Sequence, residues 1–235
     1  MTINASTDPD ENTILTIRED NEGSLWLVTG KGIKRYANGK FESYKQEDGL
    51  SDNVVQTMLI DREGSIWVGT FGGGIDRFRN ANFITYSART GLSFDNVQPV
   101  FEDSKGALWI GSNSAGVDRF KNGSVTTYTS KNGLPANDVR DLAEDKDGNI
   151  WIATVRGLVS FRNGIFTTRS KQTAAGPEPQ GNAMVQLKSG AFLVASNNRV
   201  FTARDGQFKP LFTIDSVSTN GNFIQDIWED SRGKL

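Results

Sequence analysis

The chain has 235 residues, 36% of them hydrophobic and 23% charged, and a formal net charge of −2. It contains no cysteine and no histidine, which excludes disulfides, thiolate metal sites and every catalytic arrangement that needs an imidazole. The small net charge gives no sign of a polybasic surface for nucleic acid or anionic membrane. Residues 1–11 form a polar segment without the features of a signal peptide, and no apolar run approaches the roughly 18 residues of a membrane span.

The first structured stretch starts at Asn12 and consists of short apolar segments separated by turn residues. Its hairpin signal is Asn38–Gly39, since a type I′ turn needs positive φ at both central positions. Segments of four to six residues between such signals predict β-strands. We expect four strands here, at residues 14–17, 24–29, 33–36 and 41–44.

This unit recurs along the chain. Trp26, Trp67, Trp109 and Trp151 follow one another at intervals of 41, 42 and 42 residues, and Leu193 extends the series by another 42. A period near 42 with four strands per repeat is typical of β-propeller blades. In the strand that holds Trp67, alternation places Ile66 and Val68 on the opposite face, so both faces are predicted to be buried between blades.

The later repeats vary at their connections. Asn122–Gly123 and Asn163–Gly164 keep the hairpin signal, whereas Asn80–Ala81 departs from it and Asp205–Gly206 takes its place in the fifth repeat. Residues 174–180 are predicted to be a longer surface loop. A sixth repeat begins at Asn222 and supplies one strand before Leu235.

The fold prediction is therefore an all-β propeller over residues 12–235, with about five blades and the first strand of a sixth. We expect it to be a fragment of a seven-bladed ring that is truncated at its C-terminus. Closure of a five-bladed ring by a strand at residues 222–230 is the alternative.

Three segments share a signature, G-L-x-x-N-x-V-x-x-x-x-x-D-x-x-G-x-I/L-W-I/V-G-T, which resembles the two-component regulator propeller repeat of bacteria. The copies are Gly49–Thr70, Gly91–Ser112 with Asp95 at the Asn position, and Gly133–Thr154 with Ala153 at the second Gly. The resemblance implies the periplasmic, extracytoplasmic sensor region of a hybrid histidine kinase or diguanylate cyclase of the inner membrane. It further implies a small-molecule or glycan ligand and self-association of the parent sensor, with membrane contact only through segments outside this sequence.

The repeated D-x-x-G turns are the first candidates for chemistry. The run from Asp145 to Asn149 offers three oxygen ligands, but Gly148 is misplaced for a calcium loop and Trp151 follows at once. We interpret these turns as Asx-capped hairpins and expect no metal or cofactor. The residues predicted to be structural repeats are Trp26, Trp67, Trp109, Trp151, Asp61, Asp103, Asp145, Gly64, Gly106 and Gly148.

No catalytic residue is predicted. Acidic residues are frequent but lie at repeat-equivalent positions, and Asp76 and Asp118, in IDRF and VDRF, are interpreted as blade-edge charges. Streptogramin-lyase-like propellers share the general pattern, but their chemistry uses a histidine, which this chain lacks. The alternatives to a sensor are a soluble scaffold for protein–protein interaction and a histidine-free lyase or hydrolase.

By analogy with other propellers, ligands are expected at the face that carries the loops between blades and the loops after each Trp strand. Phe71 offers a stacking surface and Arg156 a planar fork for a carboxylate or hydroxyl pair. The candidate ligand-binding residues are Asn53, Phe71, Asn96, Asn113, Asn137, Asp138, Arg156 and Asn197.

Overall fold

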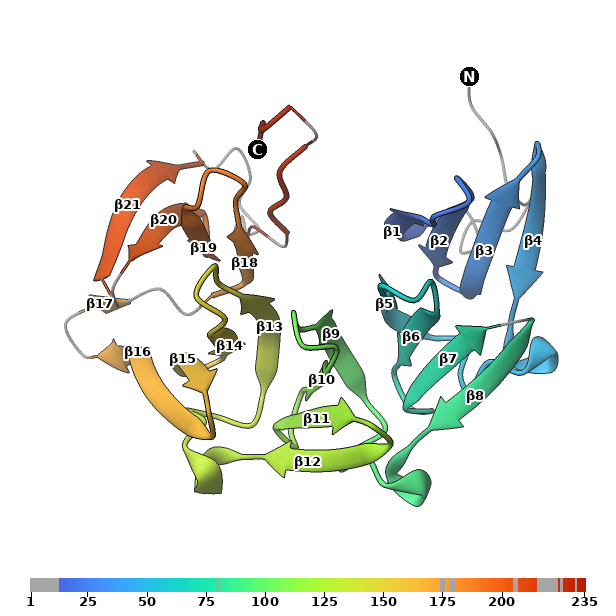
Figure 1. Cartoon of the computed structure of the whole chain (residues 1–235), viewed down its shortest axis with the longest axis horizontal. Coiled ribbons are helices and arrows are strands. Elements are labelled where there is room, and N and C mark those ends of the chain that lie inside the picture. The colour runs from blue at the N-terminus through green and yellow to red at the C-terminus, as the bar shows by residue number, and fades with distance from the viewer. Residues whose placement is uncertain are drawn as a thin grey trace. The chain divides into compact units, whose positions relative to one another are not determined.

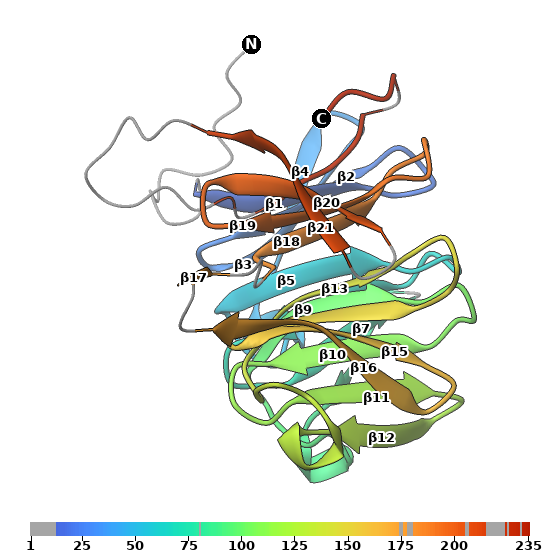
Figure 2. The same cartoon turned by 90° about the vertical axis from the view of Figure 1, so that its left-hand side faces the viewer.

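A computed structural model describes residues 13–79, 81–173, 176–177, 181–204, 207–214, 224, 226–230 and 232–235. The strands form five antiparallel sheets in chain order, β1–β4, β5–β8, β9–β12, β13–β17 and β18–β21, and neighbours in sequence are neighbours in each sheet (Figures 1 and 2). The chain divides into two compact units, Met1–Glu102 and Asp103–Leu235. The predicted all-β, four-stranded blade architecture is confirmed.

In the first unit the strands are β1 (Ile14–Glu19), β2 (Leu25–Thr29), β3 (Gly32–Ala37), β4 (Lys40–Tyr44), β5 (Val55–Ile60), β6 (Ile66–Thr70), β7 (Ile75–Arg79), β8 (Asn82–Tyr86) and β9 (Val97–Glu102). In the second unit they are β10 (Leu108–Ser112), β11 (Val117–Lys121), β12 (Ser124–Tyr128), β13 (Val139–Glu144), β14 (Ile150–Thr154), β15 (Gly157–Arg162), β16 (Ile165–Thr173), β17 (Gly176–Pro177), β18 (Ala183–Gln186), β19 (Phe192–Ser196), β20 (Arg199–Arg204) and β21 (Gln207–Thr213).

Several predicted connections differ from expectation or lie outside the described residues. Within the predicted loop at 174–180, Gly176–Pro177 forms the short strand β17, which pairs with the end of β16. The remaining residues of that loop, Asn80, the Asp205–Gly206 turn and the start of the sixth repeat lie outside the described residues.

The Asn–Gly hairpins adopt the predicted backbone. Asn38, Asn122 and Asn163 have φ of 51°, 51° and 50°, and the glycines that follow them have φ of 77°, 77° and 85°. Positive φ at both positions gives the turn a twist that matches the flanking strands. Ala81 has φ of 62°, so the second repeat holds a non-glycine residue in the same left-handed region.

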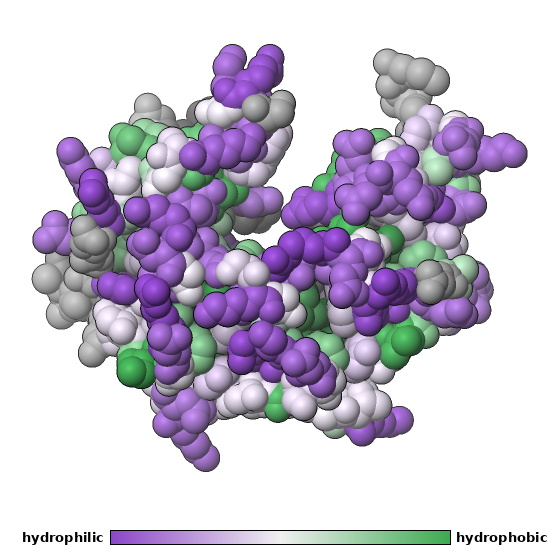
Figure 3. All heavy atoms as spheres, in the orientation of Figure 1, coloured by the Kyte–Doolittle hydropathy of each residue, from purple (hydrophilic) through white to green (hydrophobic). Residues whose placement is uncertain are grey.

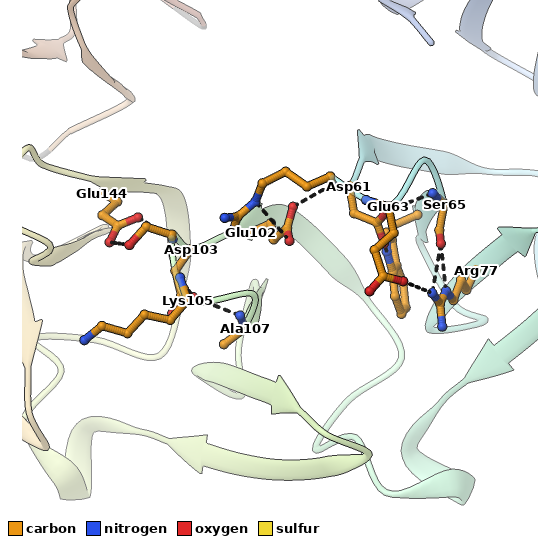
Figure 4. Close-up of polar contacts among 12 residues, drawn as sticks. Asp61, Glu63, Ser65, Arg77, Glu102, Asp103, Lys105, Ala107 and Glu144 are labelled. Atoms are coloured by element: carbon orange, nitrogen blue, oxygen red, sulfur yellow. Dashed lines mark hydrogen bonds and ion pairs between the residues drawn. The ribbon is translucent and has the colours of Figure 1, made fainter. Parts of the chain in front are cut away.

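The Asp of each D-x-x-G turn binds the Trp six residues later. The indole Nε1 atoms of Trp26, Trp67, Trp109 and Trp151 donate to Asp20, Asp61, Asp103 and Asp145 over 2.7–2.9 Å. The other carboxylate oxygen accepts two backbone N–H groups of the turn, as at Asp103, which accepts from Lys105 and Ala107 (Figure 4). The turn is thus an Asx turn, and the Asp also satisfies the polar end of a Trp that is at most 4% exposed.

These hydrogen bonds affect the acidity of the carboxylates. Partial burial raises the pKa of Asp145, but hydrogen bonds from Trp151 and Asn149 outweigh burial and hold the pKa below its usual value. The fifth repeat has Leu187 at the Asp position and Leu193 at the Trp position, so both members of the pair are replaced together. Its turn keeps the backbone bonds, with Gly190 N donating to Leu187 O and Leu187 N to Ala191 O.

An arginine covers the other side of each repeat Trp. Arg35, Arg77 and Arg119 lie directly across the sheet from Trp26, Trp67 and Trp109, with the guanidinium carbon 5.2–5.6 Å from the ring centroid. In the fourth repeat Ser160 is opposite Trp151, and Arg169 reaches over the ring from β16 at 5.3 Å and donates to Ser160 Oγ. The same cation–π contact is therefore made from a different strand.

The repeat tryptophans form the packing between neighbouring sheets, as predicted. In the first unit Trp26 and Val28 pack against Met58, Ile66 and Val68 of the next sheet. In the second unit Trp151 and Ala153 pack against Met184, Phe192 and Val194. Ile66 and Val68 belong to the cluster with Trp26, which confirms that they face away from Trp67.

Among the described residues, three short 3₁₀ helices that were not predicted lead into the Gly-Leu connections: η1 (Gln46–Asp48), η2 (Ala88–Thr90) and η3 (Ser130–Asn132). Each ends at a glycine with φ between 105° and 117°. The last helical residue uses its side chain to accept the N–H of the residue before the helix, as Asp48 does from Lys45. The small polar residue directly before each Gly-Leu pair is the sequence signal from which these 3₁₀ helices could have been predicted.

In the third to sixth repeats, the carboxylate or amide directly before the D-x-x-G-type turn position joins the repeat to the preceding turn, whereas the second repeat has Ile60 there. Arg62 N donates to Glu102 and Ser104 N to Glu144 (Figure 4), and Lys146 N donates to Gln186 and Lys188 N to Glu229, over 2.6–3.0 Å. In each pair the donor is the second residue of a D-x-x-G-type turn, and the acceptor lies about one repeat later. We call this contact the inter-repeat clamp. A Glu or Gln directly before the turn was its sequence signal.

We expect Asp103→Ala to lower the free energy of unfolding by about 2–4 kcal/mol, because three donors lose their acceptor in a nearly buried site. Urea unfolding followed by tryptophan fluorescence measures this cost. Asp147→Ala, at an exposed position of the next turn, is the control and should change stability by less than about 0.5 kcal/mol. Equal effects of both variants would contradict the role assigned to Asp103.

For the clamp, Glu144→Ala should destabilise by about 1–2 kcal/mol, because Ser104 donates to it through both N and Oγ. Glu144→Gln should cost less than half as much, since Gln186 fills the same position in the next repeat. Calorimetric melting of the two variants separates them. A Gln variant as unstable as the Ala variant would show that the negative charge, rather than an acceptor, is required.

Candidate ligand-binding loops

The candidate loops lie at the end of each sheet opposite the D-x-x-G turns. They are the loops between the second and third strands, and the loops that lead into each first strand. A side-chain hydroxyl stabilises the loop between the second and third strands. Thr70 Oγ1 donates to Gly74 O and accepts from Gly73 N, and Ser112 Oγ makes the same two bonds with Gly116 O and Ala115 N. These loops therefore present their side chains from a fixed backbone.

Glycine is required where these loops meet the sheet. Gly74 has φ of 91°, and a Cβ there would lie 2.2 Å from Tyr86 O. Gly116, with φ of 97°, would meet Tyr128 O at the same distance. Only glycine combines this backbone with so close an approach.

Backbone hydrogen bonds connect the loops within each unit. Phe71 N donates to Val54 O and Gly74 N to Asp95 O in the first unit. Gly116 N donates to Asn137 O and Val155 N to Asp138 O in the second. The loops after the Trp strands thus lie beside the loops between blades, as predicted.

Two of the predicted binding residues have a structural role. Asn53 Oδ1 accepts the N–H of Gln46, and Asn137 Oδ1 accepts the N–H of Ser130, the first residues of η1 and η3. Asp95, at the same repeat position, accepts from Ala88 at the start of η2. The Asn/Asp of the signature therefore caps a 3₁₀ helix.

Asn197 is also determined by the backbone. It has φ of 53° at the turn between β19 and β20, and its carbonyl accepts the N–H of Ile224. Few residues other than Asn and Gly adopt positive φ readily, so the backbone restricts the residue type at this position. With Asn198, Arg199 and Phe201 it lines a cavity of about 230 Å³.

Three predicted residues present exposed side chains on the loops. Phe71 is 53% exposed, beside Val54 at 50%, and so forms a small apolar surface on the second sheet. Asn113 and Arg156 are exposed on the corresponding loops of the second unit. Hydrophilic side chains cover most of the face seen in Figure 3.

Asn96 and Asp138 occupy the same repeat position, directly before the first strand, and both are half-buried. Oδ1 of each is enclosed without a hydrogen bond among the described residues. Asp138 Oδ1 lies 3.1 Å from Arg140 Nε and is neutralised by this ion pair. Because both oxygens are enclosed, a ligand could reach them only after neighbouring side chains move.

The interpretation of Asp76 and Asp118 as blade-edge charges was wrong, because both residues are 0% exposed. Asp76 accepts hydrogen bonds from Ser51 N, Ser51 Oγ and Thr85 Oγ1 at 2.6–2.9 Å. Burial raises the pKa of Asp76, and these hydrogen bonds counteract the effect. The carboxylate ties the loop between blades to the third strand and so supports the loop face from beneath.

Asp141 was not a predicted site residue. It lies at a bulge in β13, where Oδ1 accepts Leu142 N and Oδ2 accepts Met184 N from the next sheet. Burial of the carboxyl raises its pKa to about 7, and the negative charge of Asp226 adds to the effect. The equivalent residue of the second repeat is Thr57. Because the acidic residue is not repeated there, the sequence period could not predict a role for Asp141.

The family comparison matches residues 49–72 and 133–156 to the two-component regulator propeller. These segments are two-component regulator propeller repeats. They contain the Gly-Leu connection, the Asx turn, the repeat Trp and the first residues of the candidate loop, and the match confirms the resemblance drawn from the signature. No curated protein sequence matches the chain.

Solved structures show the same fold. The extracellular domain of BT4673 from B. thetaiotaomicron, described as a hybrid two-component system, is 19% identical with a TM-score of 0.78. It covers 98% of this chain and 31% of its own. The corresponding domain of BT3049 is 22% identical with a TM-score of 0.59, over 98% of this chain and 38% of that one. The chain thus spans about a third of the length of these relatives.

A lyase has a related fold. Virginiamycin B lyase from Staphylococcus aureus is 16% identical, with a TM-score of 0.71, over 90% of this chain and 73% of its own. A histidine-to-alanine variant of that lyase is catalytically inactive. Among the described residues of the present chain, no three acidic side chains gather as a metal site requires, and no helix is long and apolar enough to cross a membrane.

The raised pKa of Asp141 predicts a pH dependence. The unfolded carboxyl ionises near pH 4 and the folded one near pH 7, so the folded state holds the extra proton between these values. Stability should fall as pH rises from about 5 to 7, with a slope of at most about 1.4 kcal/mol per pH unit.

Urea unfolding at several pH values tests this expectation. Asp141→Thr, which installs the residue of the second repeat, should remove the slope. Asp226→Asn should move the window to lower pH, because it removes a neighbouring negative charge. The same slope in wild type and Asp141→Thr would assign the effect to another group.

Proposed function

We propose that the chain is the extracytoplasmic, ligand-sensing part of a bacterial two-component signalling protein and that it carries no catalytic activity of its own. The observation that carries the proposal is the match of its repeats to the two-component regulator propeller. The similarity to extracellular domains of B. thetaiotaomicron proteins described as hybrid two-component systems supports it. The parent protein would supply the kinase or cyclase output, the membrane anchor and self-association.

The chemistry of the chain supports a binding role. The acidic residues at repeat positions are engaged in Asx turns, in clamps or beneath loops, and none is paired with a histidine because the chain has none. What varies from repeat to repeat is the side chain on the loop face: Phe71, Asn113 and Arg156. A small molecule or glycan would use an aromatic surface for stacking and polar side chains for its hydroxyl or carboxylate groups.

A lyase function is not proposed. The similar lyase depends on a histidine, and the present chain lacks that residue type altogether. A role as a protein–protein scaffold gains no specific observation from the structure.

Binding can be tested by isothermal titration of the chain with neutral and acidic oligosaccharides and small carboxylates. For a compound that binds, we expect Phe71→Ala or Arg156→Ala to weaken affinity at least tenfold, since each removes a main contact of its loop. Lys105→Ala and Asp147→Ala, exposed on the opposite turns, are matched controls and should leave affinity unchanged.

Two results would contradict the proposal. Equal losses of affinity in the loop variants and the turn variants would place the ligand elsewhere. The absence of binding to any tested compound would favour the scaffold alternative. Chemical conversion of a bound compound, detected by mass spectrometry, would refute the non-catalytic assignment.

A further inference from the structure

The loop between β19 and β20 in the fifth repeat carries a charged side chain where the other repeats have glycine. Arg199 pairs with Ser196 across this loop. Its equivalents all have φ between 91° and 140°, and they are Gly32, Gly74, Gly116 and Gly157. In the fifth repeat Asn197 takes the positive φ of the loop, 53°, and Arg199 does not. The loop therefore accepts a side chain at a position that is glycine elsewhere.

The fourth strand of the fifth repeat makes this side chain possible. In the second repeat β8 ends with Tyr86, which pairs with Ile75, the residue after Gly74. In the fifth repeat β21 continues to Thr213, which pairs with Arg199 itself. Arg199 is thus a regular strand residue, and its extended backbone places its side chain on a face of the sheet.

An aromatic ring follows two positions later, on the same face of β20. Strand pairing makes Phe201 the equivalent of Asp76, the buried acid that accepts a hydrogen bond from Ser51 in the second repeat. Pro210 pairs with Phe201, whereas Thr85 pairs with Asp76. The fifth repeat thus has an apolar side chain at the position of the carboxylate that holds the loop between blades.

These substitutions border a cavity of about 230 Å³. Its lining residues are Ser196, Asn197, Asn198, Arg199 and Phe201, and none of them is acidic. Phe201 is 8% exposed, whereas Asn197 and Arg199 are exposed to solvent. The cavity therefore combines one apolar wall with polar groups that a ligand can reach.

The backbone of this loop is held in place. Asn198 Nδ2 donates to Ile214 O over 2.9 Å, and Ile214 N donates to Asn198 O over 2.8 Å. These two bonds join the loop to the residue that follows β21. A ligand in the cavity meets a preformed frame, which keeps the entropic cost of binding low.

The guanidinium of Arg199 is available to a ligand. Within the described part of the chain it makes no hydrogen bond or ion pair. Four other arginines, by contrast, lie over the rings of the repeat tryptophans; they are Arg35, Arg77, Arg119 and Arg169. A guanidinium presents a planar pair of N–H donors that matches the two oxygens of a carboxylate.

We propose that this cavity binds a small carboxylate that carries one ring, either a single sugar acid or an aromatic acid. The guanidinium of Arg199 donates to the carboxylate, and the ring lies against Phe201. The amide of Asn197 forms a hydrogen bond with a hydroxyl group on the ring. This inference rests on the proposed function, because it assigns one cavity and one ligand class to the loop face.

The size and charge of the cavity limit the choice of ligand. Its volume is below the roughly 300–1,000 Å³ of pockets for drug-sized ligands, which favours a single ring over an oligosaccharide. Arg199 and the lack of acidic lining residues disfavour a cation. An inorganic anion such as phosphate would use the arginine but would leave Phe201 without a contact.

Nuclear magnetic resonance of the arginine Nε–H groups tests the proposal on the chain itself. The signal of Arg199 is assigned by its loss in Arg199→Lys. The two kinds of acid are D-galacturonate and 4-hydroxybenzoate, and each is titrated beside a neutral counterpart, D-galactose or 4-hydroxybenzyl alcohol. We expect at least one acid, and neither counterpart, to shift the Arg199 signal to saturation. Inorganic phosphate, the anion without a ring, should bind at least tenfold more weakly than that acid.

Variants then locate the site by isothermal titration with the acid that binds. Arg199→Gln should weaken its affinity at least tenfold, because the charge and the paired donors are lost. Asn197→Gly keeps the positive φ and removes the amide, so we expect a loss of about threefold. Arg162→Gln, which changes an exposed arginine on β15 of the same unit, is the matched control and should leave affinity unchanged. Thermal melting of each variant verifies that it is folded.

The preference between galacturonate and 4-hydroxybenzoate identifies which kind of acid the cavity takes. Unchanged affinity in Arg199→Gln would overturn the proposal, as would equal binding of an acid and its neutral counterpart or of phosphate. If Phe71→Ala or Arg156→Ala abolished binding of the acid and Arg199→Gln did not, the proposed function would stand and this cavity would not be its site. Failure of both acids to shift the Arg199 signal would refute the ligand class, while binding of a neutral oligosaccharide at Phe71 would still support the sensor.

Discussion

The hydrogen bond between the turn Asp and the indole of the repeat Trp is the interaction on which the rest of the structure depends. A propeller blade must bury a large aromatic side chain between sheets, yet indole carries one N–H that cannot be left without an acceptor. The Asp six residues earlier satisfies this group and closes the turn with its other oxygen. One carboxylate therefore links local turn geometry to inter-sheet packing, and the fifth repeat, which lost the Trp, lost the Asp as well.

Most other charges of the protein act in the same structural way. Arginines make cation–π contacts with the repeat tryptophans. Carboxylates such as Glu144 accept a hydrogen bond from the preceding turn. Asp76 supports the loop between blades from a fully buried position. In a chain without histidine, this use of its acids leaves little for acid–base chemistry. The residues that remain for function are those on loops whose backbone is already fixed.

Such loops suit recognition. Thr70 and Ser112 hold the loop backbone with their hydroxyl groups, and the bond from Gly74 to Asp95 joins neighbouring loops. A ligand that binds side chains on this frame orders little additional chain, so less of its binding energy is lost to conformational entropy. The side chains can differ between repeats without disturbing the blade. If the proposed ligand sensing holds, this separation would let a regular scaffold carry an individual specificity.

The sequence by itself determined the period, the four strands of each repeat, the Asn–Gly hairpins and the burial of the repeat Trp. These features depend on local propensity and on alternation along a strand, which a single chain displays directly. The partners of side chains 25 to 43 residues apart were decided only by tertiary structure. In the folded chain Asp76, which the sequence suggested was a blade-edge charge, is buried. Asn53 and Asn137 cap 3₁₀ helices. Asp141 accepts a hydrogen bond from Met184 of the next sheet. The physical reason is that a carboxylate or amide has the same local pattern whether it meets water or a backbone N–H, and only the packing of one sheet on the next selects between them.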